Sequence, residues 1–268
     1  MIFPRKLSLF FGRIFGLCLY LFSKKSRHIA HTNINVAFPQ LSEKKSKELL
    51  IKTFIHYGMI SFEFFRQKSN KKININVDNN TKNILLEKSG LILMAAHFGN
   101  WEIFLPIISK KRKISAIVRK QNNAGGDLFI SETRRFNNVS LISNQSSFND
   151  MLKPLNNNEV LLILNDQKPK KSGTTLDFFG KPAIFPKGTG HFYIKTGLRI
   201  AVGFCTLNLD LSYNFKIKLL DIDTESKSNN ELIDQINIKY AKLLEKEIVQ
   251  FPEQYCWFYK KWDRSIYK

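Results

Sequence analysis

The sequence predicts an α/β fold with a mostly parallel central sheet, flanked by helices on both faces and preceded by an N-terminal membrane-associated helix. Two patterns support the sheet: short, continuously apolar runs recur along the chain, and segments with helical periodicity separate them. Strands that are buried on both faces have this apolar character, and their alternation with helices is typical of parallel sheets. A third pattern, an apolar segment between basic residues near the N-terminus, indicates the membrane-associated helix.

The apolar N-terminal segment covers residues 7–22, is interrupted by Arg13 and has basic residues on both sides. About 20 residues cross a hydrocarbon core, so this segment is compatible with a tilted span, an interfacial helix or a helix packed on the core. Residues 19–22 are bulky and leave no small-residue cleavage site, so we expect an uncleaved anchor. We therefore assign residues 1–30 to a membrane anchor or interfacial helix and residues 31–268 to a single folded domain.

The segments that follow are predicted from their apolar periodicity. Residues 42–66 form a long amphipathic helix with Ser42 as its N-cap, residues 70–77 an edge strand, and residues 80–88 a short helix. Buried strands are expected at 91–96, 114–118, 139–142, 160–164 and 200–207, with crossover helices at 125–136 and 147–155. A further strand at 211–220 and a helix at 230–249 complete the pattern.

The composition indicates a polyanionic partner. The chain has 42 Lys and Arg against 22 Asp and Glu, a formal net charge of +20. Nucleic acid, an anionic membrane, a phosphorylated lipid and an acidic protein all satisfy this charge. Signatures of helix-turn-helix, zinc-finger and aromatic RNA-binding proteins are not found in the sequence, which disfavours nucleic acid. The three cysteines have no metal-ligand spacing and are expected to be free thiols.

The strongest catalytic candidate is the pair His97 and Glu102, which directly follows the first buried strand. Within one helix, residues at this spacing point about 140° apart, so the pair can meet only if His97 precedes the helix and Glu102 lies in it. A neutral imidazole can then accept a hydroxyl proton while the carboxylate fixes its tautomer. The other interpretation is a structural turn histidine beside a solvated helix charge, and we favour catalysis.

Two further polar residues follow predicted strands. Arg119 follows the strand at 114–118, and Asp166 follows the strand at 160–164 after one asparagine. Because the carboxyl ends of parallel strands share one edge of a sheet, we expect both residues to join His97 in one site. Arg119 is expected to bind a phosphate or an oxyanion, and Asp166 to pair with Arg119 or position a substrate. A solvated loop cation and a weak loop ion pair are the alternatives.

Candidate substrate-binding residues surround these positions. Phe178 and Phe179 are candidates for lining an acyl groove, with core packing as the alternative. Gly188 and Thr189 begin a predicted helix whose free N–H groups can bind an anion or oxyanion. The remaining candidates are close to the catalytic positions: Asn100, Trp101, Asn122, Asn123 and Gln167.

Taken together, these motifs resemble the late acyltransferases of lipid A biosynthesis, the lauroyl and myristoyl transferases within the lysophospholipid acyltransferase-like group. The resemblance extends over nearly the whole chain. It rests on the basic-flanked apolar segment and on the motifs at residues 33–39, 96–102, 118–123, 166–167, 178–180 and 185–189, and on Trp257. The chain departs from the pattern at Val118, where an aromatic residue often precedes the arginine.

The resemblance implies an enzyme on the cytoplasmic face of the inner membrane. Such an enzyme moves a fatty acyl chain from acyl carrier protein to a hydroxyl of a phosphorylated glycolipid acceptor, without a metal or an organic cofactor. His97 and Glu102 match the family's His-x4-acid pair, and Arg119 and Asp166 match its further active-site positions. An acidic carrier protein, a phosphorylated acceptor and an anionic membrane surface would each explain the basic charge.

Two other interpretations remain open at the level of the sequence. One is an acyltransferase of the same fold that acts on another lipid acceptor. The other is a non-catalytic, membrane-associated protein that binds anionic lipid through its basic surface.

Overall fold

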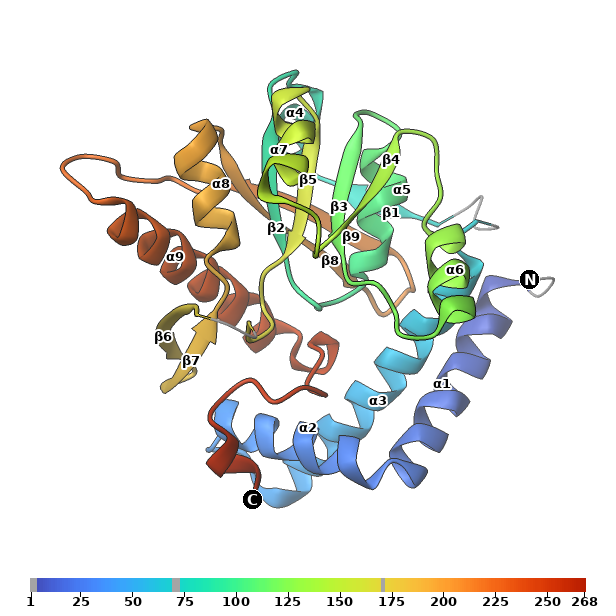
Figure 1. The fold of residues 1–268 in the computed structure, drawn as a ribbon. Helices are drawn as coiled ribbons and strands as arrows, with labels where there is room; N and C mark the ends of the chain where they lie inside the picture. The colour runs from blue at the N-terminus through green and yellow to red at the C-terminus, as the bar shows by residue number, and fades with distance from the viewer. Residues whose placement is uncertain (1–3, 69–72, 170–171) are drawn as a thin grey trace.

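The computed structural model describes residues 4–68, 73–169 and 172–268, and it has the α/β architecture expected from the sequence (Figure 1). The helices are α1 (Arg5–Phe22), α2 (Lys24–Ala37), α3 (Glu43–Arg66), α4 (Asn79–Leu86), α5 (Phe104–Ile108), α6 (Ala124–Thr133), α7 (Phe148–Asn156), α8 (Gly188–Thr196) and α9 (Asn229–Gln250). The strands are β1 (Ile75–Val77), β2 (Leu91–Ala95), β3 (Ile114–Val118), β4 (Val139–Ser143), β5 (Val160–Leu164), β6 (Thr174–Phe178), β7 (Lys181–Phe185), β8 (Ile200–Leu207) and β9 (Tyr213–Leu219).

The central sheet has the strand order β1-β9-β8-β2-β5-β3-β4 in the described part of the chain. Neighbouring strands are parallel except for β8 and β9, so the expectation of a mostly parallel sheet is confirmed. The predicted edge strand at 70–77 is shorter than expected and becomes β1; residues 70–72 lie outside the described residues. The sequence reasoning missed the antiparallel hairpin of β6 and β7, which is separate from the sheet.

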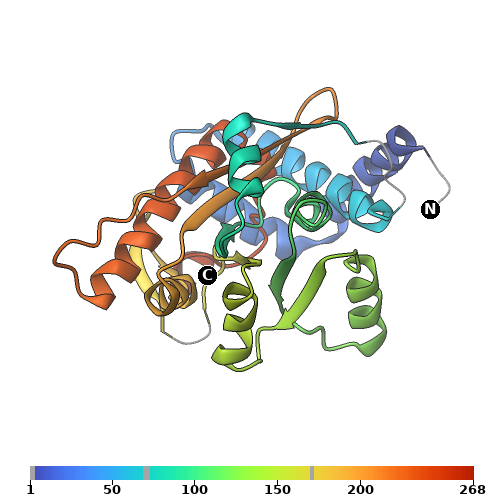
Figure 2. The same cartoon turned by 90° about the horizontal axis from the view of Figure 1, so that it is seen from above.

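Helices cover both faces of the sheet. Successive residues of a strand point to opposite faces, so a continuously apolar strand presents apolar side chains on both faces that the helices bury. Ile92 and Met94 of β2 pack in a core cluster with α7, α8 and α9. Leu91 and Leu93 of the same strand pack in a second cluster with α4 and α5. Figure 2 shows these two groups of helices on opposite sides of the sheet. The strands are therefore continuously apolar because both of their faces are buried.

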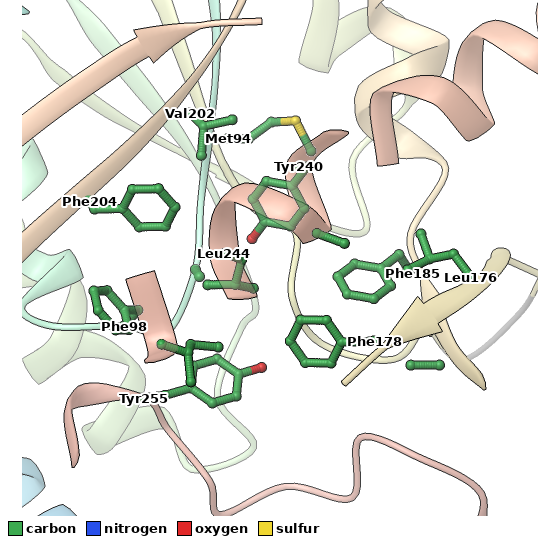
Figure 3. Close-up of a cluster of buried hydrophobic side chains, with 14 of the residues drawn as sticks. Met94, Phe98, Leu176, Phe178, Phe185, Val202, Phe204, Tyr240, Leu244 and Tyr255 are labelled. Carbon is green, nitrogen blue, oxygen red and sulfur yellow. The ribbon is translucent and has the colours of Figure 1, made fainter. Parts of the chain in front are cut away.

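The first core cluster reaches beyond the sheet to the hairpin and the C-terminal segment (Figure 3). Phe178 and Phe185 of the hairpin meet Tyr240 of α9 and Tyr255 near the C-terminus in this cluster. The rings of Phe178 and Phe185 are T-shaped with centroids 5.4 Å apart, a favourable geometry for aromatic pairs. This aromatic core fixes the hairpin and the C-terminal segment against the sheet.

The N-terminal segment forms two helices rather than one. α1 and α2 meet at Ser23 with a bend of 95°, and the domain boundary that we predicted at residue 30 falls inside α2. α1 lies against α3 through glycines, where the backbones approach closely. A Cβ atom built on Gly58 would lie 2.2 Å from the Gly12 carbonyl oxygen and 2.6 Å from the Gly16 nitrogen. Any side chain at residue 58 must therefore push the two helices apart.

We expect Gly58→Leu to lower the free energy of unfolding by at least about 1–3 kcal/mol, because overpacking forces the backbones of α1 and α3 apart. Thermal unfolding followed by circular dichroism measures this loss. Gly126→Ala in α6 is the matched control, since a Cβ there has its nearest neighbour, Asn123 Oδ1, at 3.7 Å. Equal melting temperatures for the two variants would show that the α1–α3 contact is not tightly packed.

Candidate active site

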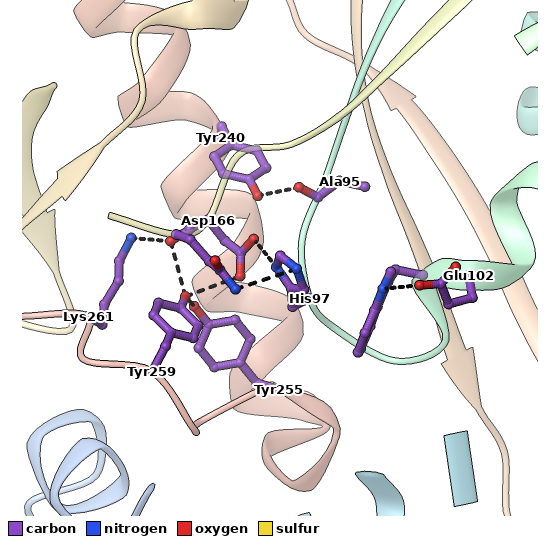
Figure 4. A network of polar contacts seen from close by, with 10 residues as sticks. Ala95, His97, Glu102, Asp166, Tyr240, Tyr255, Tyr259 and Lys261 are labelled. Carbon is purple, nitrogen blue, oxygen red and sulfur yellow. Dashed lines mark hydrogen bonds and ion pairs between the residues drawn. The ribbon is translucent and has the colours of Figure 1, made fainter. Parts of the chain in front are cut away.

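His97 and Asp166 meet at the carboxyl edge of the sheet (Figure 4). β2 and β5 are adjacent and parallel, with Ala95 opposite Leu164, and each polar residue follows two positions after the end of its strand. The Nδ1 atom of His97 lies 2.8 Å from Oδ1 of Asp166. The shared rim that we expected from the strand ends is therefore present for these two residues.

The turn after β2 presents the imidazole at this edge. Gly99 has φ of +60°, and a Cβ there would lie 1.9 Å from the carbonyl oxygen of Cys205, so glycine is needed. The Gly99 N–H donates to the Gln254 carbonyl at 2.8 Å, and the Asn100 N–H donates to the Cys205 carbonyl at 2.8 Å. The turn is thus held by β8 on one side and by the C-terminal segment on the other. Both N–H groups are therefore occupied in holding the turn.

The electrostatics of the pair suit a base and its orienting acid. Burial by itself lowers the pKa of His97, but the charge and hydrogen bond of Asp166 outweigh it, and the net pKa is raised above the ordinary 6.5. Burial pushes the pKa of Asp166 upward, while His97 and Lys261 lower it, and the net pKa is below its ordinary value. The carboxylate therefore stays charged at neutral pH and favours the Nδ1–H tautomer of His97, with Nε2 left to accept a proton.

Glu102 does not contact His97, contrary to the sequence expectation. Its carboxylate accepts hydrogen bonds from Arg134 at 2.5 and 2.9 Å and from the indole N–H of Trp101 at 3.1 Å. The physical reason is the turn: Glu102 lies in a short 3₁₀ helix, Trp101–Ile103, that faces α6, while Nδ1 of His97 faces β5. The Trp101 side chain contacts both groups: its ring centroid lies 5.2 Å from that of His97, and its indole N–H donates to Glu102.

Arg119 does not reach Asp166 either. It follows β3 as expected, but it is exposed on the connecting loop, and the described partners of the Asp166 carboxylate are His97 and Tyr259. Asn122 and Asn123 are exposed on the same loop, where Asn123 caps α6 by accepting from the Gly126 N–H at 2.8 Å. Together these loop residues line a polar hollow of about 530 Å³ at the start of α6.

Three of the predicted substrate-binding residues belong to the loops that carry His97 and Asp166. Gln167 is exposed, with its Nε2 atom 3.5 Å from Nε2 of His97. Trp101 is partly buried and contacts the His97 ring. Asn100 is buried and donates to the Tyr213 hydroxyl at 3.0 Å, which makes it a structural residue of the turn.

The other predicted substrate-binding residues are farther from this chemistry. Phe178 is fully buried in the aromatic core, so the groove-lining role expected for it is wrong and the core-packing alternative holds. Phe179 has φ of +54° and lines a hollow between α2 and the hairpin. Thr189 is fully buried and donates to Asn165 Oδ1 at 3.3 Å, so it supports the loop after β5 rather than facing a ligand. Gly188 is exposed at the start of α8.

An apolar groove reaches Trp101, the neighbour of His97. It lies between α3 and α6, has a volume of about 420 Å³ and includes Trp101, Glu102 and Arg134 in its lining. A smaller hollow shares these three residues and reaches the ends of β3 and β5. The remaining walls of the groove are mostly apolar: Tyr57, Ile60, Phe64, Phe65, Phe129 and Ile130. A lining of this kind can bind an apolar chain, and the groove reaches Trp101, whose ring contacts His97.

Sequence reasoning missed three residues of this region. Arg134 neutralises Glu102 from α6, while Tyr259 and Lys261 contact Asp166 from the C-terminal segment. Nothing in the spacing of these residues marks them, because each contact joins segments far apart in the chain. In the described ranges, groups of three or more potential metal ligands are not found, and the three cysteines are free thiols. The expectation of no metal and no cofactor stays a prediction.

Comparisons with known proteins identify the family of this chain. The family described as bacterial lipid A biosynthesis acyltransferase matches residues 1–264. The lipid A biosynthesis palmitoleoyltransferase of Escherichia coli is 21% identical over 96% of this chain and 85% of its own length. The lipid A biosynthesis lauroyltransferase of the same organism is 21% identical over 90% of this chain and 80% of its own length.

A solved structure, the 1-acyl-sn-glycerophosphate acyltransferase of Thermotoga maritima, aligns with a TM-score of 0.41 at 13% identity over 92% of this chain and 98% of that one. That likeness is too distant to support a conclusion. The family match covers almost all of the chain and includes His97, Asp166 and the residues of the groove. The chain therefore belongs to the bacterial lipid A biosynthesis acyltransferase family.

Proposed function

We propose that this protein transfers a fatty acyl chain from the thioester of acyl carrier protein to a hydroxyl group of a phosphorylated lipid A precursor. Membership of the family supports acyl transfer in lipid A biosynthesis. The observation that carries the mechanism is the half-buried His97–Asp166 hydrogen bond near an apolar groove.

The reaction uses Nε2, the imidazole nitrogen that is not bound to Asp166. Nε2 of His97 takes the proton of the acceptor hydroxyl, and the oxygen attacks the thioester carbonyl carbon. This attack forms the C–O bond of the tetrahedral intermediate, which then collapses to the ester by re-forming the carbonyl and breaking the C–S bond. The imidazolium returns its proton to the departing thiolate, so His97 ends neutral. Asp166 stabilises the imidazolium in between and keeps the ring in one orientation.

The groove between α3 and α6 is proposed to bind the acyl chain. Glu102 contributes here rather than at the imidazole, because it fixes Arg134 and Trp101 at the groove end nearest His97. Gln167, 3.5 Å from Nε2 of His97, is proposed to position the polar reacting groups.

The polar hollow with Arg119 is proposed to receive the charged parts of the substrates. It shares Gly126 and Ile130 with the apolar groove, so a polar and an apolar surface adjoin at α6. Arg119 and Lys120 supply positive charge there, which favours phosphate groups or the acidic carrier protein. The net charge of +20 steers each of these anionic partners to the enzyme.

We propose that α1 associates with the cytoplasmic face of the inner membrane. Among the described helices, none alone has the length and hydropathy of a membrane span; α1 and α2 pass that test only as a bent pair. α1 buries Gly12 and Gly16 against α3, and its other side exposes large apolar side chains: Phe10, Phe11, Ile14, Phe15, Leu21 and Phe22. A helix with one packed side and one exposed apolar side is suited to the interface of a bilayer.

His97→Ala tests the proposed function directly. We expect the variant to fold and to lose at least about 10²- to 10⁴-fold in turnover, because positioned proton transfer is removed. The measurement is acyl transfer by purified enzyme from acyl carrier protein to a lipid A precursor. His191→Ala, which removes an exposed histidine of α8, is the control and keeps normal turnover. Near-normal turnover without His97 would refute the mechanism.

Asp166→Asn and Glu102→Gln distinguish which of the two carboxylates orients His97. Since His97 acts as a neutral base, turnover falls as the pH drops through its pKa, which Asp166 raises above 6.5. Asp166→Asn should move this acidic limb to lower pH and reduce kcat by about 10⁴-fold, because the amide no longer holds the correct tautomer. Glu102→Gln should move the limb less, since its charge contributes less to that pKa. The opposite ranking in a pH–rate series would restore Glu102 as the orienting acid.

Phe22→Glu tests the membrane contact of α1. The substitution places a charge on the most exposed ring of the apolar side, and we expect about tenfold weaker binding to anionic phospholipid vesicles, because the apolar area of that ring no longer enters the bilayer. Vesicle flotation measures the bound fraction. Leu86→Glu at the end of α4 is the matched control, a similarly exposed apolar residue on another helix. Equal loss in both variants would argue against a specific role of α1.

A further inference from the structure

A segment near the C-terminus, residues 254–262, passes directly beside the catalytic pair, and we refer to it as the C-terminal strap (Figure 4). It is joined to the His97 turn by backbone hydrogen bonds. The Cys256 N–H donates to the His97 carbonyl at 2.9 Å, and Phe98 forms a bridge with Tyr255. The proposed reaction uses none of the strap's side chains, yet two of them contact Asp166.

Tyr259 of the strap binds the side of Asp166 that faces away from His97. Its hydroxyl lies 3.1 Å from Oδ2 of Asp166 and 3.1 Å from the Asp166 carbonyl oxygen. The hydroxyl of Tyr255 also contacts it. Tyr259 has one proton to donate, so if Tyr255 donates to Tyr259, the Tyr259 proton is left for Asp166. Oδ1 then binds His97 and Oδ2 binds Tyr259, so the carboxylate cannot rotate without losing a hydrogen bond.

The Lys261 side chain supports Asp166 by binding the Asp166 backbone. Its Nζ atom donates to the Asp166 carbonyl oxygen at 2.6 Å, and the ammonium lies 3.3 Å from the centroid of the Phe185 ring. The side chain is 1% exposed, and burial lowers its pKa to about 7 despite the opposing charge of Asp166. The side-chain N–H of Lys261 fixes the Asp166 peptide, and the protonated form of the amine also stabilises the carboxylate.

We propose that Tyr259 is a positioning residue for acyl transfer, the third member of a chain His97–Asp166–Tyr259, with Lys261 holding the peptide that carries Asp166. This inference rests on the proposed role of His97 as the base. Without Tyr259, the buried carboxylate keeps its charge but loses a hydrogen bond that offsets part of that charge. It is then free to turn, and it attracts the proton of the imidazolium more strongly.

Tyr259→Phe tests this chain, because it removes the hydroxyl and keeps the ring. We expect kcat to fall about 10- to 100-fold, the value of a hydrogen bond to a charged group, with KM unchanged. The acidic limb of the pH–rate profile should move to higher pH, opposite to the shift expected for Asp166→Asn. Tyr240→Phe is the matched control: its buried hydroxyl donates to the Ala95 carbonyl at 2.8 Å, so a comparable hydrogen bond is lost outside the chain.

A second readout does not depend on activity. The His97 imidazole can be titrated by ¹⁵N NMR in wild-type protein, Tyr259→Phe and Lys261→Met, and both variants should show a raised pKa of His97. Lys261→Met also serves if Tyr259→Phe fails to fold. An unchanged pKa of His97, or full kcat in Tyr259→Phe, would overturn the inference. A protein that shows these NMR shifts without any acyl transfer would instead disprove the proposed function and leave the positioning chain intact.

Discussion

The hydrogen bond between His97 and Asp166 depends on the register of two neighbouring parallel strands. Ala95 lies opposite Leu164, and His97 and Asp166 each lie two positions beyond the last residue of their strand. A slip of one residue would turn every side chain of one strand to the other face of the sheet and separate the pair. The apolar side chains buried on both faces oppose that slip. The hydrophobic core therefore sets the geometry of the polar site.

Trp101 lies where the polar site meets the apolar groove, because it contacts His97 and also lines the groove. On one side its ring contacts His97, and on the other its indole N–H donates to Glu102. Arg134 neutralises Glu102, so the groove ends in a paired charge rather than an isolated one. Isolated charges in apolar surroundings are costly, and the pairing explains how a carboxylate is tolerated beside a surface suited to hydrocarbon. The proposed base and the proposed acyl-binding groove are thus adjacent sites of opposite polarity.

The N-terminal helices connect this site to the surface of the molecule. α3 contributes one wall of the groove and also the face on which α1 packs. Close backbone contact through Gly12, Gly16 and Gly58 leaves the bulky side chains of α1 on its outer side. One helix therefore joins the exposed apolar surface to the groove, which relates the proposed membrane contact to the proposed acyl-binding site through a single element.

The sequence by itself determined the strands of the central sheet, most helices and the position of His97, because apolar periodicity and strand ends are local properties. It also placed Asp166 on the correct rim. Only the tertiary structure decided that Asp166 rather than Glu102 is the partner of His97, since local spacing does not reveal which strands are neighbours or how a turn directs its side chains. The same holds for Tyr259, which reaches Asp166 across 93 residues of sequence. Such contacts arise from the packing of distant segments, and no pattern within a short stretch of residues records them.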